Sequence, residues 1–416
     1  MQGFDVIVLG TGPAGLAAAE ASARQGLRVA VVSPRPAAVW PNFYGLWSDE
    51  ANALGIEGQL AERWERVELR LSAEERYVLP RGYARIDNPS LFSRLQGGAA
   101  RAGAVFFKGT AASVARGARA RLVTFDDGRA LEGWAVLDAT GHRSERRRGR
   151  VEQMAYGVVL VPSRSLLDPD TPRLMDFSGV PGADPREPTF LYALPLSGGR
   201  FLLEETSLAR APALPLATVQ ERLARRLAHL GVDGEVSFEE RSFIPLTPPL
   251  PARDGLVIPL GSAASLVNPA TGYMIPAALR HAREVASLLA EGRRAGRPFD
   301  EVALAAWDLT WPPEQRLVRR LRLFGIDVLR RLDLEGTRRF FAALLSATPD
   351  GWRAFLSFDA LPDELAAVML ETFRALPRRL QIRTTLGLSR HLGLLAHLTR
   401  EGGITRGHIP RRSHVG

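Results

Sequence analysis

The feature that most constrains the fold is a glycine pattern close to the N-terminus. Residues 4–9 form a short apolar run, and residues 10–15 follow it with the spacing GxGxxG. Residues 13–25 show the alanine-rich pattern of a helix, and residues 27–32 form a second apolar run. A strand, this glycine turn, a helix and a second strand are typical of a Rossmann-type dinucleotide-binding unit. We therefore expect a bound dinucleotide rather than an empty α/β fold.

Each glycine of the turn has its own expected role. Gly10 makes the turn, Gly12 lets the backbone approach a pyrophosphate, and Gly15 allows the helix to pack closely on the strand. The start of the helix, with Pro13 and Ala14, would face the phosphates, because a helix N-terminus attracts anions.

The second strand ends at Ser33, where such units usually carry an acid that binds a ribose. A hydroxyl can also bond a ribose, but more weakly than a carboxylate. The missing acid weakens the expected ribose contact and leaves the expected pyrophosphate site unchanged.

Two later segments are also expected to contact the cofactor. An apolar strand ends in small residues near position 140, and a second strand, 255–260, ends in a loop of small residues. We expect a helix over 272–291 whose free N–H groups would suit an anion. An ordinary strand turn and a plain helix cap are the alternatives. The cofactor-binding residues predicted here are Ala139, Thr140, Gly141, Gly261, Asn268, Thr271, Gly272 and Tyr273.

Glu204 and Glu205 are two adjacent carboxylates at the end of an apolar strand. Side chains alternate along a strand, so the two would point to opposite faces, one toward a cavity and one toward solvent or an arginine. A carboxyl in an apolar cavity has a raised pKa and can act as a general acid. A solvated strand end is the alternative. Tyr44 and Trp47 belong to an aromatic segment that would line a pocket, or pack on itself.

The pattern along the chain predicts an α/β fold with three parts. Residues 1–150 and 240–295 would form a discontinuous, Rossmann-like, two-dinucleotide FAD-binding domain. Residues 151–239 alternate as in an antiparallel sheet and would form an inserted substrate domain, followed by a helical region at 296–416.

Several classes of protein are excluded. The chain has no cysteine, and its seven histidines show no spacing typical of metal ligands, so we expect no metal, disulfide or thiol chemistry. No apolar run reaches the length of about 18 residues that a membrane-spanning helix needs. The N-terminus has no pattern of a targeting signal, which favours a cytoplasmic location.

The C-terminal region is basic. Residues 310–416 contain 18 arginines and 10 acids, which accounts for +8 of the net charge of +9. Leu317, Leu321, Phe324, Val328 and Leu332 form an apolar stripe at helical spacing. We expect this region to bind a membrane surface, and we expect no nucleic-acid partner. An internal helical bundle with solvated arginines is the alternative.

The order of these motifs resembles that of the plant and cyanobacterial lycopene β-cyclases. The glycine turn is followed by Tyr44-Gly-Leu-Trp47-Ser-Asp-Glu50, then by Leu203-Glu-Glu-Thr-Ser-Leu208, then by Asn268-Pro-Ala-Thr-Gly-Tyr273. The family carries YGVW-D-E, FLEETSL and HPSTGY at matching places. The chain departs from the family pattern at three places: Leu202 replaces a Phe, Asn268 replaces a His, and Ser33 replaces the acid.

The resemblance implies an enzyme that closes the ψ end of lycopene, or of γ-carotene, into a β-ionone ring with no net redox change. Such an enzyme is an intramolecular lyase or isomerase that needs reduced FAD, with NAD(P)H as the electron source. Glu204 would be the acid and Glu205 its alternative. Whether one or both ends are cyclised stays open, and other enzymes of carotenoid biosynthesis would be partners. Two other functions remain: an FAD-dependent hydroxylase or polyprenyl reductase, and a non-catalytic carotenoid-binding protein.

Overall fold

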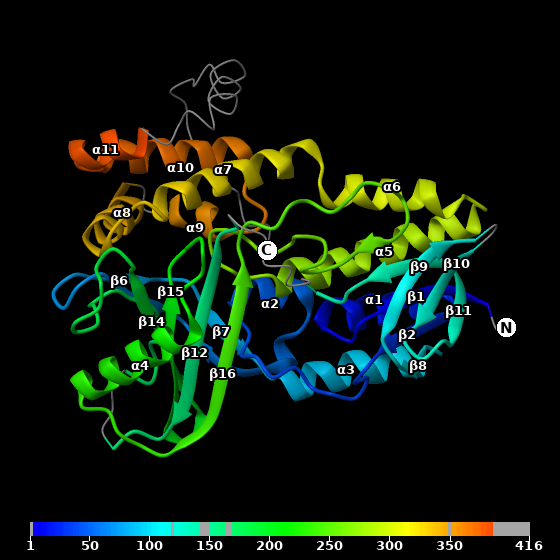
Figure 1. The fold of residues 1–416 in the computed structure, drawn as a ribbon, viewed down its shortest axis with the longest axis horizontal. Helices are drawn as coiled ribbons and strands as arrows, with labels where there is room; N and C mark the ends of the chain where they lie inside the picture. Colours follow the sequence, from blue (N-terminus) through cyan, green and yellow to red (C-terminus); the bar gives the residue numbers. More distant parts are fainter. Residues whose placement is uncertain (1–2, 118–119, 142–149, 164–167, 348–350, 386–416) are drawn as a thin grey trace.

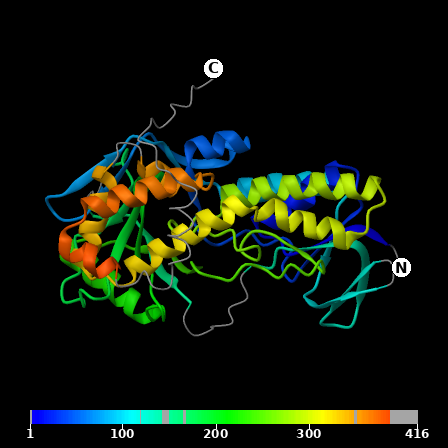
Figure 2. The same ribbon diagram turned by 90° about the horizontal axis from the view of Figure 1, so that it is seen from above.

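The computed structural model describes residues 3–117, 120–141, 150–163, 168–347 and 351–385. Two large sheets lie side by side along the length of the molecule, and a group of helices covers one of them (Figure 1). The view from above shows that the chain after residue 300 crosses from the first sheet to the second (Figure 2).

The first sheet contains the predicted dinucleotide-binding unit. β1, α1 (Pro13–Arg24) and β2 follow one another as the sequence predicts, and the parallel strands β8, β2, β1, β11 and β17 (Ile258–Pro259) pair in that order. An antiparallel extension, β10 and β9, completes the sheet. The remaining bounds are β8 (Val105–Lys108), β2 (Val29–Ser33), β1 (Phe4–Leu9), β11 (Ala130–Asp138), β10 (Arg121–Phe125) and β9 (Ala111–Arg116).

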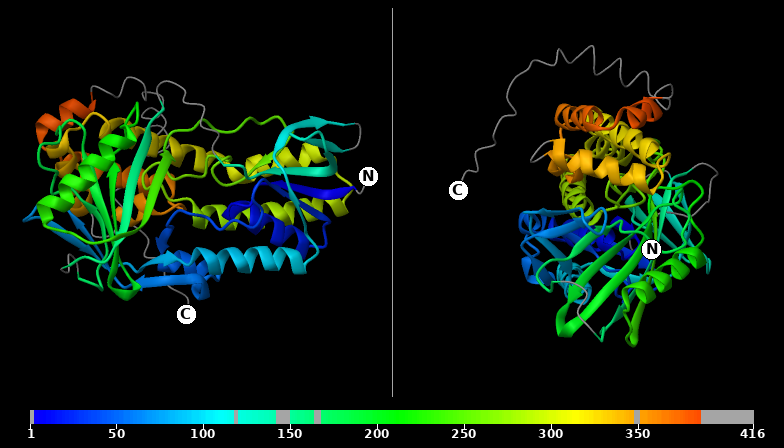
Figure 3. Two further views of the ribbon diagram at one scale, coloured as in Figure 1. Left: turned by 60° about the horizontal axis from the view of Figure 1, so that its bottom comes forward. Right: turned by 90° about the vertical axis from the view of Figure 1, so that its left-hand side faces the viewer.

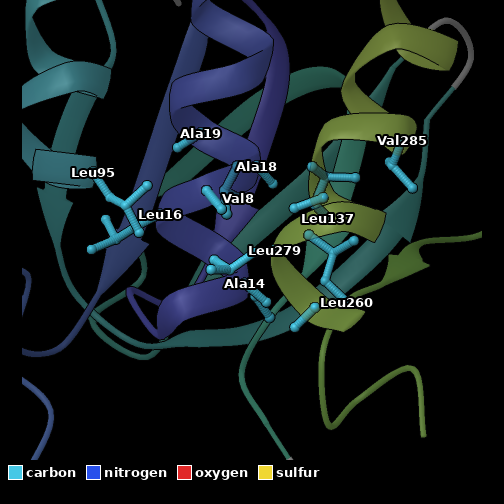
Figure 4. Close-up of a cluster of buried hydrophobic side chains, with 14 of the residues drawn as sticks. Val8, Ala14, Leu16, Ala18, Ala19, Leu95, Leu137, Leu260, Leu279 and Val285 are labelled. Atoms are coloured by element: carbon cyan, nitrogen blue, oxygen red, sulfur yellow. The ribbon is translucent and has the colours of Figure 1, made fainter. Parts of the chain in front are cut away.

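The core of this part forms where α1 lies between the sheet and two further helices, α3 (Asn88–Arg101) and α5 (Ile275–Arg294). The alanines of α1 are buried on all sides, and their small size lets α5 approach the helix closely. Figure 4 shows the side chains that meet there, and the labelled ones are Val8, Ala14, Leu16, Ala18, Ala19, Leu95, Leu137, Leu260, Leu279 and Val285.

The second sheet is largely antiparallel, as the alternation after residue 151 predicts. Its strands are, in spatial order, β16 (Val236–Pro245), β12 (Glu152–Leu160), β15 (Arg200–Ser207), β14 (Thr189–Leu196), β13 (Arg173–Asp176), β5 (Val67–Arg70) and β6 (Arg76–Leu79). β5 and β6 belong to residues 1–150, which the sequence predicts to be part of the FAD-binding domain, and β16 runs across the predicted domain boundary at residue 240. The proposed domain boundaries themselves stay a prediction.

The two faces of this sheet have different neighbours. α4 (Leu216–Leu230) packs on one face, against Leu191, Leu203 and Phe201. A three-stranded sheet of β3 (Gly45–Trp47), β7 (Tyr83–Ile86) and β4 (Leu60–Trp64) lies near the other face, with α2 (Ser48–Leu54) and η1 (Glu57–Gln59) beside it. The aromatic segment around Trp47 thus contains a short strand and the start of a helix.

The region after residue 296 is helical, as predicted, in its described part. Its later helices are stacked above the second sheet (Figure 3), whereas the first of them lies along α5 beside the first sheet. They are α6 (Phe299–Thr310), α7 (Pro313–Leu329), α8 (Leu334–Ala347), α9 (Gly351–Leu356), α10 (Pro362–Ala375) and α11 (Arg378–Thr385). Among the described residues, no helix is both long and apolar enough to cross a bilayer.

The apolar stripe of α7 does not form a membrane-binding face, and this part of the prediction is wrong. Leu321, Val328 and Leu332 are buried, and they pack with Phe341 and Leu365 in one hydrophobic cluster. The helical spacing arises because α7 faces the neighbouring helices and the second sheet. Five of the arginines counted in the basic region lie beyond residue 385, outside the described part of the chain.

Candidate active site

The predicted cofactor residues meet at one edge of the first sheet. β1, β11 and β17 run parallel, with Leu9 opposite Asp138 and Asp138 opposite Pro259. Ala139, Thr140 and Gly141 therefore leave the sheet beside the glycine turn, where parallel α/β sheets bind their ligands. Gly261 reaches the same place, because a Cβ added to it would lie 3.0 Å from Cβ of Ala14.

The three glycines of the turn differ in what surrounds them. A Cβ on Gly10 would lie 2.5 Å from the carbonyl oxygen of Ala139, and a Cβ on Gly15 would lie 2.2 Å from that of Gly10. Gly12, in contrast, has no atom within 4 Å of such a Cβ. Gly10 and Gly15 are thus required by close packing, while the space in front of Gly12 is open and fits a pyrophosphate.

Ser33 is buried beside this turn. Its Oγ accepts hydrogen bonds from Oγ1 of Thr11, at 3.0 Å, and from the backbone N–H of Arg35, at 3.3 Å. A hydroxyl that accepts two bonds still has one proton to donate, so Ser33 can bond a ribose oxygen.

The turn before α5 differs from the prediction. The helix begins at Ile275 rather than at residue 272, and the N–H groups of Thr271 and Gly272 bond the carbonyl oxygen of Asn268 at 3.2 and 2.8 Å. They are therefore not free to bind an anion. The side chain of Asn268, also buried, accepts from the N–H of Ala270 and fixes this turn, while Thr271, Gly272 and Tyr273 face a cavity.

That cavity has a volume of about 450 Å³ and lies between the second sheet, the 262–275 loop and the C-terminal helices. Its wall is mostly apolar and includes Leu202, Val267 and Phe341. Tyr44 and Trp47 line it, as predicted. The loop that lines it begins directly after Gly261, so it leads from the edge where the predicted cofactor residues meet to the wall of the cavity.

Glu204 faces this cavity. Among the residues that the structure describes, Oγ1 of Thr206 donates a hydrogen bond to it, at 3.0 Å. Burial, and next the charge of Glu240, raise the pKa of Glu204 to about 8. The carboxyl is therefore protonated at neutral pH and can give up a proton inside an apolar cavity.

Glu205 points to the opposite face of the sheet, as strand alternation predicts. Its two carboxylate oxygens accept from Nε and Nη2 of Arg226 on α4, at 2.6 and 2.9 Å, and Oγ1 of Thr189 also bonds it. Both members of the pair are buried. Glu205 is therefore held in an ion pair away from the cavity and holds α4 against the sheet.

Glu240 is a second carboxylate of the cavity that the sequence interpretation missed. It lies on β16 and is 4% exposed. Its Oε1 accepts from Nδ2 of Asn42 at 3.2 Å, the N–H of Phe43 at 3.1 Å and Oγ of Ser242 at 3.0 Å. Its Oε2 has no hydrogen-bond partner within the described part of the chain. The pair Glu239-Glu240 on an alternating strand resembles the pair at 204 and 205, and that signal was available in the sequence.

Gly157 separates the two cavity carboxylates. It lies opposite Glu204 on one side and opposite Glu240 on the other, so the three residues form a row across β15, β12 and β16. Residues directly opposite on neighbouring strands share a face of the sheet. A Cβ on Gly157 would lie 3.0 Å from Cβ of Glu204. Glycine at this position leaves the two carboxylates room to approach each other.

A group of tyrosines forms the wall next to Glu204. Tyr192 lies opposite Glu204 in the sheet, and its hydroxyl is 3.0 Å from that of Tyr83, which is 2.8 Å from that of Tyr273. Burial raises the pKa of all three well above the usual value, so they stay neutral. Trp47 packs edge-on against Tyr83 and is itself covered by the guanidinium of Arg81.

Comparison with known proteins identifies the family. A family profile described as lycopene cyclase protein matches residues 5–381. The chain belongs to this family. The resemblance in the sequence motifs is thereby confirmed, and the match also includes the C-terminal helices.

Curated relatives agree with this assignment. The chain is 34% identical to a lycopene beta cyclase of Arabidopsis thaliana over 392 residues, covering 89% of this chain and 78% of that one. It is also 34% identical, over 386 residues and with the same coverage, to a capsanthin/capsorubin synthase of Capsicum annuum.

Solved structures support the predicted fold. A geranylgeranyl bacteriochlorophyll reductase-like protein from Thermoplasma acidophilum matches with a TM-score of 0.68 at 15% identity, covering 96% of this chain and 99% of that one. A mutant of the halogenase PltM in complex with FAD matches with a TM-score of 0.60 at 12% identity, covering 88% and 85%. The α/β fold of FAD-binding flavoproteins is therefore confirmed.

The glycine turn generates a prediction with two different outcomes. Gly12→Val should leave the fold intact and abolish flavin binding, because the new side chain occupies only the open space expected for the pyrophosphate. Gly15→Val should unfold or strongly destabilise the protein, because its side chain meets the Gly10 carbonyl. Flavin absorbance of the purified protein and its thermal unfolding measure the two effects. Stoichiometric flavin in Gly12→Val would contradict the placement.

Proposed function

We propose that the protein is a lycopene β-cyclase that converts a ψ end of lycopene or γ-carotene into a β-ionone ring. The observation that carries the proposal is the buried carboxyl of Glu204, which faces an apolar cavity and whose pKa is raised by that burial. An acid of this kind suits the protonation of an alkene, which offers no polar group for binding.

The reaction follows from the placement of that acid. Glu204 gives its proton to C2 of the terminal double bond and leaves a cation at C1. The C5=C6 bond attacks this cation and closes the ring, which leaves a new cation at C5. Loss of the proton from C6 then neutralises this cation and restores the C5=C6 double bond. The carotene keeps its composition, so no electrons are consumed overall.

The cavity wall would protect the cation from water. Tyr44, Trp47 and Tyr192 line the cavity, and the π face of an aromatic ring can stabilise a cation without reacting with it. The apolar side chains around them exclude water, and water would otherwise capture the cation as an alcohol.

FAD would lie along Gly10, Gly12 and Gly15, with Ser33 at the ribose and the residues after β11 and β17 beside it. The open space at Gly12 and the free proton of Ser33 fit the group. When bound in its reduced form, with NAD(P)H as electron source, it supplies negative charge near the cation.

Glu204→Gln tests the proposed acid directly. Gln keeps the size of the side chain but cannot deliver a proton, so ring formation should fall by about 10²–10⁴-fold, a typical cost of removing a general acid. The variant should fold and bind FAD. Chromatography of the pigments in a lycopene-producing host measures the loss.

Glu205→Gln is the matched comparison, because it makes the same chemical change on the neighbouring residue of the same strand. It should reduce stability, since it leaves Arg226 buried without its partner charge, but folded protein should still form rings. Near-normal ring formation in Glu204→Gln, or a specific loss in folded Glu205→Gln, would contradict the assignment.

We also propose that the protein is cytoplasmic and attaches peripherally to membranes, from which its water-insoluble substrate is drawn. The face that supports this is on α10 and α11, where Ile382 is 63% exposed among exposed arginines, Arg374, Arg378, Arg379 and Arg383. Arginines near an anionic leaflet contribute about 1 kcal/mol each.

Charge reversal on this face should weaken attachment. Arg378→Glu combined with Arg379→Glu should reduce the fraction of protein that floats with anionic vesicles. The matched control is Arg24→Glu with Arg101→Glu, which changes exposed arginines at the ends of α1 and α3. Equal loss in both double variants, or no loss in either, would contradict attachment through α11.

A further inference from the structure

We propose that Glu240 is the catalytic base of the same site: it carries the negative charge opposite Glu204 and accepts the proton that ring closure releases from C6. This inference rests on the proposed cyclase function, and it assigns a role to a residue outside the family motifs quoted above.

The first argument is position. Glu204 and Glu240 lie on the same face of the second sheet, one on each side of Gly157, and both line the cavity. In the substrate, C2 and C6 are both bonded to C1 once the ring has closed. The atom that gains a proton and the atom that loses one are thus separated by a single carbon, so the acid and the base must both reach the same end of the substrate, as two groups on one wall of the cavity can.

The second argument is the difference in hydrogen bonding. Three donors converge on Oε1 of Glu240, from Asn42, Phe43 and Ser242, and such bonds favour a carboxylate. Glu204 accepts only from the hydroxyl of Thr206. Burial raises the pKa of both groups, but the donors oppose this rise at Glu240, whereas the charge of Glu240 adds to it at Glu204. Glu204 therefore holds the proton and Glu240 the charge.

The third argument is the free oxygen. Oε2 of Glu240 is buried without a partner, which is costly for a carboxylate and unusual in a folded protein. The three bonds to Oε1 leave Oε2 as the oxygen that remains to accept a proton. A partner that arrives only during the reaction explains why this oxygen is kept unpaired.

The proton balance closes within the pair. The C2–H bond forms with the proton of Glu204, and the C1–C6 bond forms with the electrons of C5=C6. The C6–H bond then breaks, its electrons restore C5=C6, and its proton goes to Oε2 of Glu240. Glu240 returns the proton to the adjacent Glu204, so that no oxidant, reductant or net proton is used.

Glu240→Gln tests the inference, with Glu239→Gln as the matched control on the same strand. Glu239 is exposed and bonded to Arg241, so its variant should behave as the wild type. Gln at position 240 keeps an oxygen for the three donors but cannot accept the proton. Cyclisation of lycopene in vesicles by the FAD-reduced holoenzyme should fall by about 10²-fold or more. Glu240→Asp should recover part of this loss.

A pH profile separates catalysis from a structural role. Wild-type activity should fall as the pH rises through about 8, where Glu204 loses its proton. Removing the charge of Glu240 lowers the pKa of Glu204, so the residual activity of Glu240→Gln should fall at a lower pH. Tyr44 and Tyr192 also face the pair, and both stay neutral over this range because burial raises the pKa of each hydroxyl. Arg241 is the other charged side chain of this part of the cavity wall.

The outcomes distinguish the two claims. If Glu204→Gln is inactive while Glu240→Gln keeps the wild-type rate and pH profile, Glu240 is not the base and the proposed cyclase function stands. If both variants cyclise lycopene normally, the assignment of the acid fails as well. A rate loss in Glu240→Gln with an unmoved pH profile would overturn the charge assignment.

Discussion

The chemistry that we propose for this cyclase homologue depends on two carboxyl groups that share one face of a sheet across a glycine. Gly157 provides the space, and the burial of both groups makes their charges interact strongly. Two buried carboxylates side by side cannot both be charged at low cost, so one of them stays protonated. The hydrogen bonds to Glu240 decide which one. A carboxyl that keeps its proton for the first step and a carboxylate for the last step thus follow from one arrangement.

The donors that hold Glu240 also connect the cavity to the edge of the first sheet where the predicted cofactor residues meet. The segment that supplies Asn42 and Phe43 to Glu240 is anchored at its other end by Trp40, whose Nε1 donates to the carbonyl of Thr11 in the glycine turn at 2.8 Å. On the far face, the pair of Glu205 and Arg226 holds α4 against the sheet. The sheet therefore separates a structural ion pair from a reactive carboxyl pair.

Much of the fold could be predicted from the sequence because its signals are local. The glycine turn, the alanine-rich helix and the alternating strands each depend on neighbouring residues, and the opposite directions of Glu204 and Glu205 follow from strand geometry alone. Three features could not be predicted because they depend on distant contacts. The stripe of α7 faces helices rather than lipid, the turn at Asn268 delays the start of α5, and Glu240 meets Glu204 only when β16 pairs with β12.

The central claim is that Glu204 carries a proton in the resting protein at neutral pH. Infrared difference spectroscopy tests it most directly, through the carbonyl stretch of a protonated carboxylic acid. The account predicts a band that is present in the wild type, disappears as the pH is raised above about 8, and is absent from Glu204→Gln but kept in Glu205→Gln. A wild-type spectrum identical to that of Glu204→Gln at neutral pH would contradict it.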